Sequence, residues 1–229
     1  MAGWSASQRR DLIGLGIVLG AMNASFYLAI ARLPLGTVGA IEFLGPIALA
    51  AVGVRSIHNA AALGLAIVGV GLLTNVRVEA EPVGIAFAFA NCVLFMLYIL
   101  LGHRVAQAGG GAAIDRLGAA MLVALVVVMP IGIRDAAPAF GQPLLLLAGA
   151  GVGICSSVIP YVCDQLAMAR LPRSTFALLL ALLPATAVAV GVVVLRQTPT
   201  FVEAGAVALI VCAVALHRAR NADDRASAA

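Results

Sequence analysis

A single carboxylate, Glu42, lies inside an apolar run that continues to Val54. An ionisable side chain at membrane depth costs on the order of 2 to 4 kcal/mol, so such a residue is a candidate for a functional site. Pro46 follows four residues later, and a proline removes the hydrogen bond to the carbonyl four positions before it. Glu42 therefore offers a carboxylate and a freed backbone oxygen, which suits a proton or a cationic amine. The alternative is a glutamate that is hydrogen-bonded between helices for packing.

Three further groups of polar and aromatic side chains are spaced so that each group shares one face of a helix. They are Asn23 with Tyr27, then Asn91 with Phe95 and Tyr98, and finally Ser157 with Tyr161 and Asp164. Such groups, converging from several helices, would form a site for a polar metabolite. Ser, Asn and Tyr also hold membrane helices together, so packing is the alternative for each residue. Asp164, near the end of its segment, is expected to gate that side or to cap its helix.

The amino-acid composition indicates that these residues lie in membrane helices. Of the 229 residues, 63% are hydrophobic and 10% are charged, whereas about a quarter of a soluble domain is charged. The net charge of +4 comes from arginines that lie singly or in pairs between apolar runs, as in loops that flank membrane helices. The chain is therefore expected to be a membrane protein whose partner is the lipid bilayer, with no nucleic acid.

Apolar segments of about 17 to 25 residues can cross a bilayer as helices. We predict an all-α membrane protein with eight spans, at residues 12–30, 35–54, 59–76, 83–102, 117–133, 144–163, 174–195 and 201–216. Arginine is enriched in cytoplasmic loops, and alternate connections place ten arginines on one side and four on the other. Both termini are therefore predicted to be cytoplasmic, with residues 218–229 as a cytoplasmic tail.

The segment around Glu42 recurs 138 residues later. Residues 31–54 and 169–192 are identical at 11 of 24 positions, whereas Leu180 replaces Glu42. The two copies fall in the second and seventh predicted spans and so cross in opposite directions, which makes an inverted repeat. Such repeats commonly hold a substrate site near the bilayer midplane and move by rocking of one half against the other. We expect a one-sided site centred on Glu42; a purely structural duplication is the alternative.

Prolines and glycines indicate where these helices bend and pack. Kinks are expected at Pro46, Pro160 and Pro184. Gly16 with Gly20, and the run of Gly149, Gly151 and Gly153, are small faces that permit close contact between helices.

The repeat also predicts how the chain is divided. In the second half, two spans (83–102 and 117–133) precede the helix that leads into the second copy, whereas only 11 residues precede the corresponding helix of the first half. We therefore expect a ten-helix, five-plus-five fold without its first two helices. Residues 1–76 would form a partial first repeat and residues 83–217 a second repeat of five helices.

The sequence lacks the catalytic residues that several enzyme classes require. The three histidines lie at predicted helix ends without an HExxH motif, and no P-loop or Rossmann glycine pattern occurs. Lysine is absent, which argues against a Ser/Lys protease, and no paired buried aspartates suggest an aspartyl protease. The four cysteines lie inside apolar segments without CxxC spacing. No enzymatic activity, metal or cofactor is therefore expected.

The chain resembles the EamA family of the drug/metabolite transporter superfamily, and within it the threonine/homoserine exporter group of inner-membrane permeases. The residues that carry the resemblance are Met22-Asn23 with Phe26-Tyr27, ProLeuGly at 34–36, GluPheLeuGlyPro at 42–46, IleProTyr at 159–161, and AlaArgLeuPro at 169–172 with Thr175-Phe176 and Pro184. The resemblance covers nearly all of the chain from Arg10 to His217.

The resemblance implies a fold of two inverted five-helix repeats around a central cavity. It also implies export of small amino acids or related metabolites, driven by the proton gradient, with Glu42 at the acid of the family motif. The ligand would then be a small amino acid or metabolite, and a homodimer stays open. A nucleotide-sugar or drug permease is an alternative within transport. A truncated, non-transporting protein or a partner subunit is the alternative outside it.

Overall fold

The computed structural model describes residues 5–33, 35–52, 56–73, 81–107, 110–183 and 200–216, together with residues 186, 189, 193 and 196. Throughout these residues the secondary structure is helical and no strand is present, which confirms the predicted all-α class. The chain forms two compact units. Unit 1 contains Met1–Leu33 and Glu81–Leu171, and unit 2 contains Pro34–Ala80 and Pro172–Ala229. The kink predicted at Pro184 lies outside the described residues.

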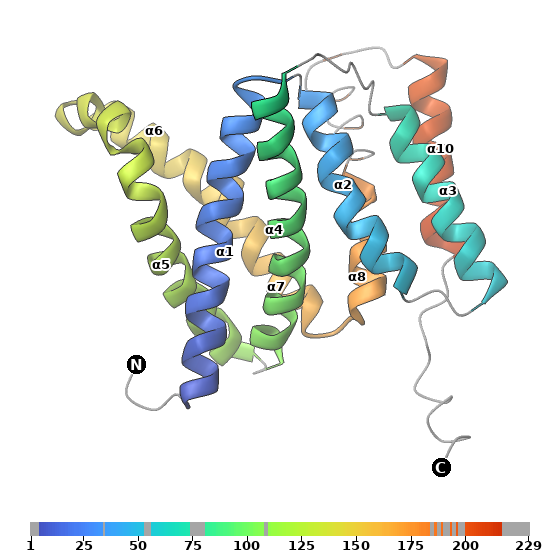
Figure 1. The fold of residues 1–229 in the computed structure, drawn as a ribbon, viewed down its shortest axis with the longest axis horizontal. Helices are drawn as coiled ribbons and strands as arrows, with labels where there is room; N and C mark the ends of the chain where they lie inside the picture. Colours follow the sequence, from blue (N-terminus) through green and yellow to red (C-terminus); the bar gives the residue numbers. More distant parts are fainter. Residues whose placement is uncertain are drawn as a thin grey trace. The chain divides into compact units, whose positions relative to one another are not determined.

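Unit 1 is built from long apolar helices. They are α1 (Ala6–Ile30), α4 (Pro82–Ala106), α5 (Gly110–Ala136), α6 (Pro143–Gly153) and α7 (Ile159–Met168), with the short helices η1 (Ala137–Gly141) and η2 (Ile154–Val158) between them. α6, η2 and α7 follow one another without a break, so that Pro143–Met168 is one membrane-length helix. α1 packs against α4 and α5, and α7 packs against the same two helices (Figure 1). Four helices of unit 1 are thus long and apolar enough to cross a membrane.

Capping residues set where α1 and α4 begin, and α1 begins six residues before its predicted span. The Ser5 hydroxyl accepts from the Gln8 N–H at 3.2 Å, and the Gln8 side chain accepts from the Ser5 N–H at 3.0 Å. This capping box begins α1 at Ala6. In α4, Pro82 occupies the first turn and the Glu81 carboxylate accepts from the Gly84 N–H. The apolar spans therefore marked the membrane-crossing parts, whereas polar residues set the ends of the helices.

The glycine pair of α1 provides the contact with α5. A Cβ atom at Gly16 would lie 2.5 Å from the Ala120 carbonyl oxygen and from the Val123 Cβ. At Gly20 it would lie 2.9 Å from the Val127 Cβ. Both distances are shorter than real Cβ contacts, so only glycine lets α5 approach this closely. The predicted packing role of this pair is confirmed.

The second small face behaves differently. A Cβ atom at Gly149, Gly151 or Gly153 would meet no atom of the described residues within 4 Å. The α6 residues around these glycines are exposed, including Leu144 and Leu147. The prediction of close helix contact at this face is therefore wrong for the part of the chain that the structure describes.

A π-helical turn lies directly before Pro160, and a kink at Pro160 stays a prediction. Pro160 lies in the first turn of α7, directly after η2, and the Ile159 N–H donates to the Ile154 carbonyl five residues earlier. A proline has no N–H to donate, and a π turn is a common way in which a helix absorbs such an irregularity. The turn contains Ser157, one of the predicted site residues.

Unit 2 contains α2 (Leu35–Val52), α3 (Ile57–Leu73), α8 (Arg173–Leu179) and α10 (Phe201–Leu216). α2 packs against α3 and α8, and α3 packs along α10. A Cβ atom at Gly69 would lie 2.6 Å from the Ile210 side chain, so glycine again permits a close approach. Pro46 is buried inside α2, and the kink predicted there stays a prediction.

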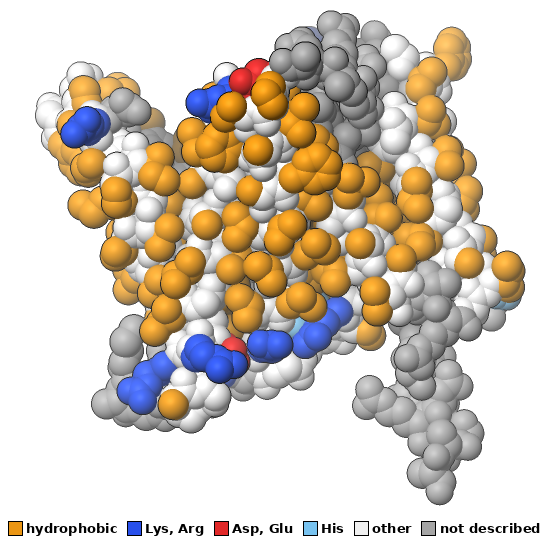
Figure 2. Space-filling model, in the orientation of Figure 1, with side chains coloured by type: hydrophobic (Ala, Val, Ile, Leu, Met, Phe, Trp, Pro, Cys, Tyr) orange, Lys and Arg blue, Asp and Glu red, His pale blue; other side chains and the backbone are white. Residues whose placement is uncertain are grey.

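Charged side chains lie at the ends of the unit 1 helices. Arg104, in the last turn of α4, forms an ion pair with Asp11 near the start of α1 at 3.8 Å. Arg9 and Arg10 are exposed in the first turns of α1. Figure 2 shows basic side chains gathered along the lower edge of this face, beneath a largely hydrophobic surface. This distribution of apolar and basic side chains is typical of membrane helices and their loops.

Candidate functional site

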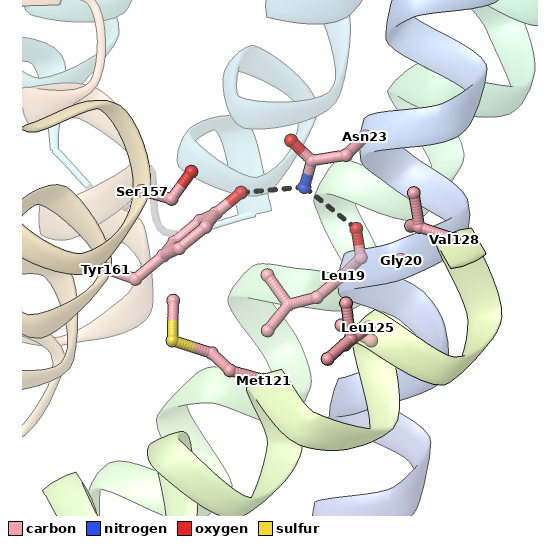
Figure 3. Close-up of a pocket in the computed structure, with 9 residues that line it drawn as sticks. Leu19, Gly20, Asn23, Met121, Leu125, Val128, Ser157 and Tyr161 are labelled. Carbon is pink, nitrogen blue, oxygen red and sulfur yellow. Dashed lines mark hydrogen bonds between the residues drawn. The ribbon is translucent and has the colours of Figure 1, made fainter. Parts of the chain in front are cut away.

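A cavity of about 250 Å³ lies within unit 1, where α1, α5 and the η2–α7 part of the Pro143–Met168 helix meet. It is lined by Leu19, Gly20, Asn23, Met121, Ala124, Leu125, Val128, Ser157 and Tyr161. Figure 3 shows side chains from the three helices facing this space. Ser157 lies in the π turn and Tyr161 lies in α7, and both side chains line the cavity. The π turn before Pro160 therefore forms part of the cavity wall.

One hydrogen-bonded group forms the polar side of the cavity. The Asn23 Nδ2 donates to the Tyr161 Oη at 2.9 Å and to the Leu19 carbonyl at 2.9 Å (Figure 3). The Ser157 hydroxyl lies on the same wall as Tyr161. Among the described lining residues none carries a charge. The cavity therefore offers neutral donors and acceptors on a mostly apolar surface, the usual composition of a small-molecule site.

Tyr98 of α4 packs against Tyr161. Its side chain is 1% exposed, and its hydroxyl donates to the Asp164 Oδ2 at 2.8 Å. The Tyr98 and Tyr161 rings meet edge to face, with centroids 5.6 Å apart, and Phe95 stacks on Tyr98 at 6.1 Å. Five of the predicted residues thus form one connected group, namely Asn23, Tyr98, Ser157, Tyr161 and Asp164.

Two other predicted residues lie apart from this group. Tyr27 is 64% exposed and is not among the described residues that line the cavity. Asn91 is 0% exposed, and neither atom of its amide has a hydrogen-bond partner among the described residues. Their part in binding stays a prediction.

Asp164 does not cap its helix. α7 continues to Met168 and ends with the Ala169 N–H donating to the Gln165 carbonyl. The Asp164 carboxylate instead joins α7 to α4 through Tyr98. Of the two expectations for Asp164, the helix cap is wrong, and the gate stays a prediction.

Glu42 lies in α2 of unit 2, where it is half-buried within an apolar helix. Pro46 lies four residues later in the same helix. A role for Glu42 in binding stays a prediction.

The sequence did not single out the apolar wall of the cavity. Met121, Leu125 and Val128 of α5 supply much of it, and nothing distinguishes them from other apolar residues of that span. The available signal was indirect, because Gly16 and Gly20 bring α5 against α1.

The contacts across the cavity match the offset of the repeat. Asn23 and Tyr161, which are hydrogen-bonded, are 138 residues apart. Leu19 and Ser157, which line the same cavity, have this separation too. The turns that follow also match, since the N–H groups of Arg32 and Arg170 donate to the carbonyls of Ala29 and Ala167, respectively, each at 3.0 Å.

Comparisons with known proteins agree with this architecture. Residues 82–218 match the model of the EamA-like transporter family. A solved crystal structure that is 21% identical aligns over 94% of this chain and 76% of its own, with a TM-score of 0.71. At that level of identity the likeness concerns the fold alone.

Two relatives are similar over most of their length. The threonine/homoserine exporter RhtA of Escherichia coli (strain K12) is 33% identical over 213 residues, which are 92% of this chain and 71% of the relative. The protein of the same name from Salmonella typhimurium (strain SL1344) is 32% identical over the same shares. By its fold, its family match and these relatives, the chain belongs to the EamA-like transporter family and is a transporter rather than an enzyme.

Proposed function

We propose that this protein is a secondary transporter that exports small amino acids such as threonine or homoserine, or related metabolites, across the cytoplasmic membrane. The observation that carries the proposal is the neutral polar cavity of unit 1, built from Asn23, Ser157 and Tyr161. The similarity to threonine/homoserine exporters supports the same substrate class.

The size and chemistry of the cavity favour a small zwitterion. A volume of about 250 Å³ lies below the range of roughly 300 to 1,000 Å³ that is usual for drug-sized ligands. Both N–H groups of the Asn23 amide are engaged by Leu19 and Tyr161, so the Asn23 Oδ1 can accept from an ammonium or hydroxyl group of the substrate, and the Ser157 hydroxyl can donate to its carboxylate. A nucleotide sugar is larger and carries phosphates that require cations, and the described lining contains no cation. These observations favour an amino acid over a nucleotide sugar.

Glu42 is the second element of the proposal. Its carboxylate lies in an apolar helix, four residues before Pro46. A charged group in an apolar membrane helix costs free energy, and for that reason such a residue is a candidate for function. We assign it to the ammonium group of the substrate or to a coupling proton.

Two inverted repeats form the third element. In addition to the equivalent contacts across the cavity, α2 packs against α8 and α3 against α10 within unit 2. Both are pairs of segments at or near the offset of 138 residues. We propose that residues 1–76 and 83–217 are the repeats, that eight spans are present, and that rocking between the halves gives alternating access.

The arginine distribution supports cytoplasmic termini. In unit 1 the ion pair between Arg104 and Asp11 places the start of α1 and the end of α4 at one end, which is the end richer in arginine. Fusing a fluorescent protein that matures only in the cytoplasm to the C-terminus tests this. Fluorescence is expected, and a dark but stable fusion would contradict the orientation.

Transport is tested by purifying the protein into liposomes that are preloaded with radiolabelled threonine, homoserine, a nucleotide sugar or a cationic drug. We expect efflux of the two amino acids, accelerated by a proton gradient, and background efflux of the others. If only the nucleotide sugar or the drug were released, the proposed amino acid substrates would be wrong and the released compound would define the substrate class. Absence of any flux would favour a non-transporting protein or a partner subunit.

A further inference from the structure

The helix that contributes Tyr161 to the cavity also contains Asp164, whose carboxylate accepts one hydrogen bond from a described residue. Asp164 is half-buried in α7, within a membrane-length helix. A carboxylate can accept several hydrogen bonds, yet among the described residues Asp164 accepts only the one from Tyr98. An ionisable group in such a position requires a function or a strong partner.

Among the described residues, no cationic side chain of the helices packed against α7 forms an ion pair with Asp164. On α4, Arg104 pairs with Asp11, and the His103 ring nitrogens lie 3.1 and 3.0 Å from the carbonyl oxygens of Ile99 and Leu171, respectively. The other titratable or charged groups of the packed elements are Cys92 on α4, Asp115, Arg116, Arg134 and Asp135 on α5, Cys155 on η2, and Tyr161 and Cys163 on α7. Within the described part of the chain, no ion pair joins Asp164 to any cation. Its charge is therefore stabilised mainly by the Tyr98 hydroxyl.

A short series of contacts links Asp164 to the cavity. Tyr98 donates to Asp164, the Tyr98 ring packs edge to face against Tyr161, and the Tyr161 hydroxyl accepts from Asn23. Tyr98 is 1% exposed, so its ring is held by its neighbours on all sides. A change in the hydrogen bond at Asp164 is therefore transmitted to the ring that bears a polar group of the cavity.

We propose that Asp164 carries the coupling proton of this transporter and that Tyr98 reports its protonation to Tyr161. This inference rests on the proposed function and deepens it, because it leaves Glu42 for the ammonium group of the substrate. As a carboxylate, Asp164 accepts from Tyr98. When it takes a proton from water on one side of the membrane, it becomes a neutral donor and Tyr98 loses its anionic acceptor. Release of that proton on the other side completes the cycle.

The test separates proton coupling from substrate binding by measuring two activities in liposomes. One is threonine efflux driven by an imposed pH gradient, and the other is exchange of labelled for unlabelled threonine without a gradient. We expect Asp164→Asn, which still accepts from Tyr98, to keep exchange and to lose gradient-driven efflux and its pH dependence. Asp115→Asn removes an exposed carboxylate of α5 and should retain both activities.

The outcomes are distinct. Gradient-driven efflux that is unchanged in Asp164→Asn overturns the assignment of Asp164 alone, since the wild-type protein still transports. If Asp164→Asn loses both activities, Asp164→Glu decides. Gradient-driven efflux with a shifted pH profile in that variant supports a titrating group, and loss of all activity overturns it. A wild-type protein that moves no threonine overturns the proposed function itself.

Discussion

The Asn23 amide donates to the Tyr161 hydroxyl at 2.9 Å, and the two residues are separated by the 138 positions that relate the repeated segments. If the repeats are related by a two-fold axis, residues at equivalent positions that touch each other must lie on or beside that axis. Leu19 and Ser157, an equivalent pair on the same cavity, agree with this placement. The cavity would then lie where inverted repeats commonly hold their substrate.

Exchanging the two residues tests the symmetry. Asn23→Tyr and Tyr161→Asn, made singly, should each lower threonine efflux, because two tyrosines crowd the cavity and two asparagines leave a gap. The double variant should recover much of the loss, since equivalent positions present the same geometry with the side chains reversed. A coupling free energy of about 0.5 to 3 kcal/mol is expected from thermal unfolding of the four proteins. Losses that simply add in the double variant would argue against equivalence.

The π turn offers a matched pair of serines. Ser157 lines the cavity, whereas Ser156 is exposed beside it in the same turn. Ser157→Ala should raise the KM for threonine several-fold, because a typical hydrogen bond contributes about 1 kcal/mol. Ser156→Ala should leave the KM unchanged. Equal effects of the two substitutions would show that the turn matters only for folding.

The close contact between α1 and α5 gives a prediction about stability. Gly16→Ala should destabilise the protein by about 1 to 3 kcal/mol, because its methyl group would overlap Ala120 and Val123. Gly14 lies in the same helix, and a Cβ atom there would lie 3.6 Å from Leu101, an ordinary contact. Gly14→Ala should therefore stabilise the helix by up to about 1 kcal/mol. Thermal unfolding in detergent measures both, and a Gly16→Ala protein as stable as Gly14→Ala would contradict the packing.

A neutral isostere tests Glu42. Glu42→Gln should abolish the resistance to excess threonine or homoserine that the transporter confers on cells, because glutamine has no charge to meet an ammonium group and no proton to exchange. The amount of protein in the membrane is measured in parallel by immunoblotting. Unchanged efflux at an equal amount of protein would remove Glu42 from the mechanism.

Helical class and the polar residues of the cavity could be predicted from the sequence for one physical reason. Polar side chains are costly in apolar helices, so Asn23, Ser157 and Tyr161 stand out and their spacing assigns them to faces. The structure brings these three together at one cavity. The start of α10 at Phe201 was predicted correctly because hydropathy changes there.

Other features depend on contacts that hydropathy does not contain. The start of α1 is set by the Ser5 capping box, and the π turn before Pro160 is not specified by a lone proline in the sequence. Tyr27 shares a helix face with Asn23 by spacing, yet it is 64% exposed, so spacing along one helix does not decide which of two residues is covered. The partner of Asp164 on α4 followed only from the packing of α4 against α7.

The central claim is that the cavity beside Asn23 and Tyr161 binds the transported amino acid. It is tested most directly by the concentration dependence of threonine efflux from liposomes that contain the wild-type protein or Tyr161→Phe. Removing the hydroxyl deletes the acceptor for Asn23 and one polar group of the cavity. We predict a KM about fivefold higher, the equivalent of roughly 1 kcal/mol, with a matching amount of folded protein. An identical KM for the two proteins would contradict the account.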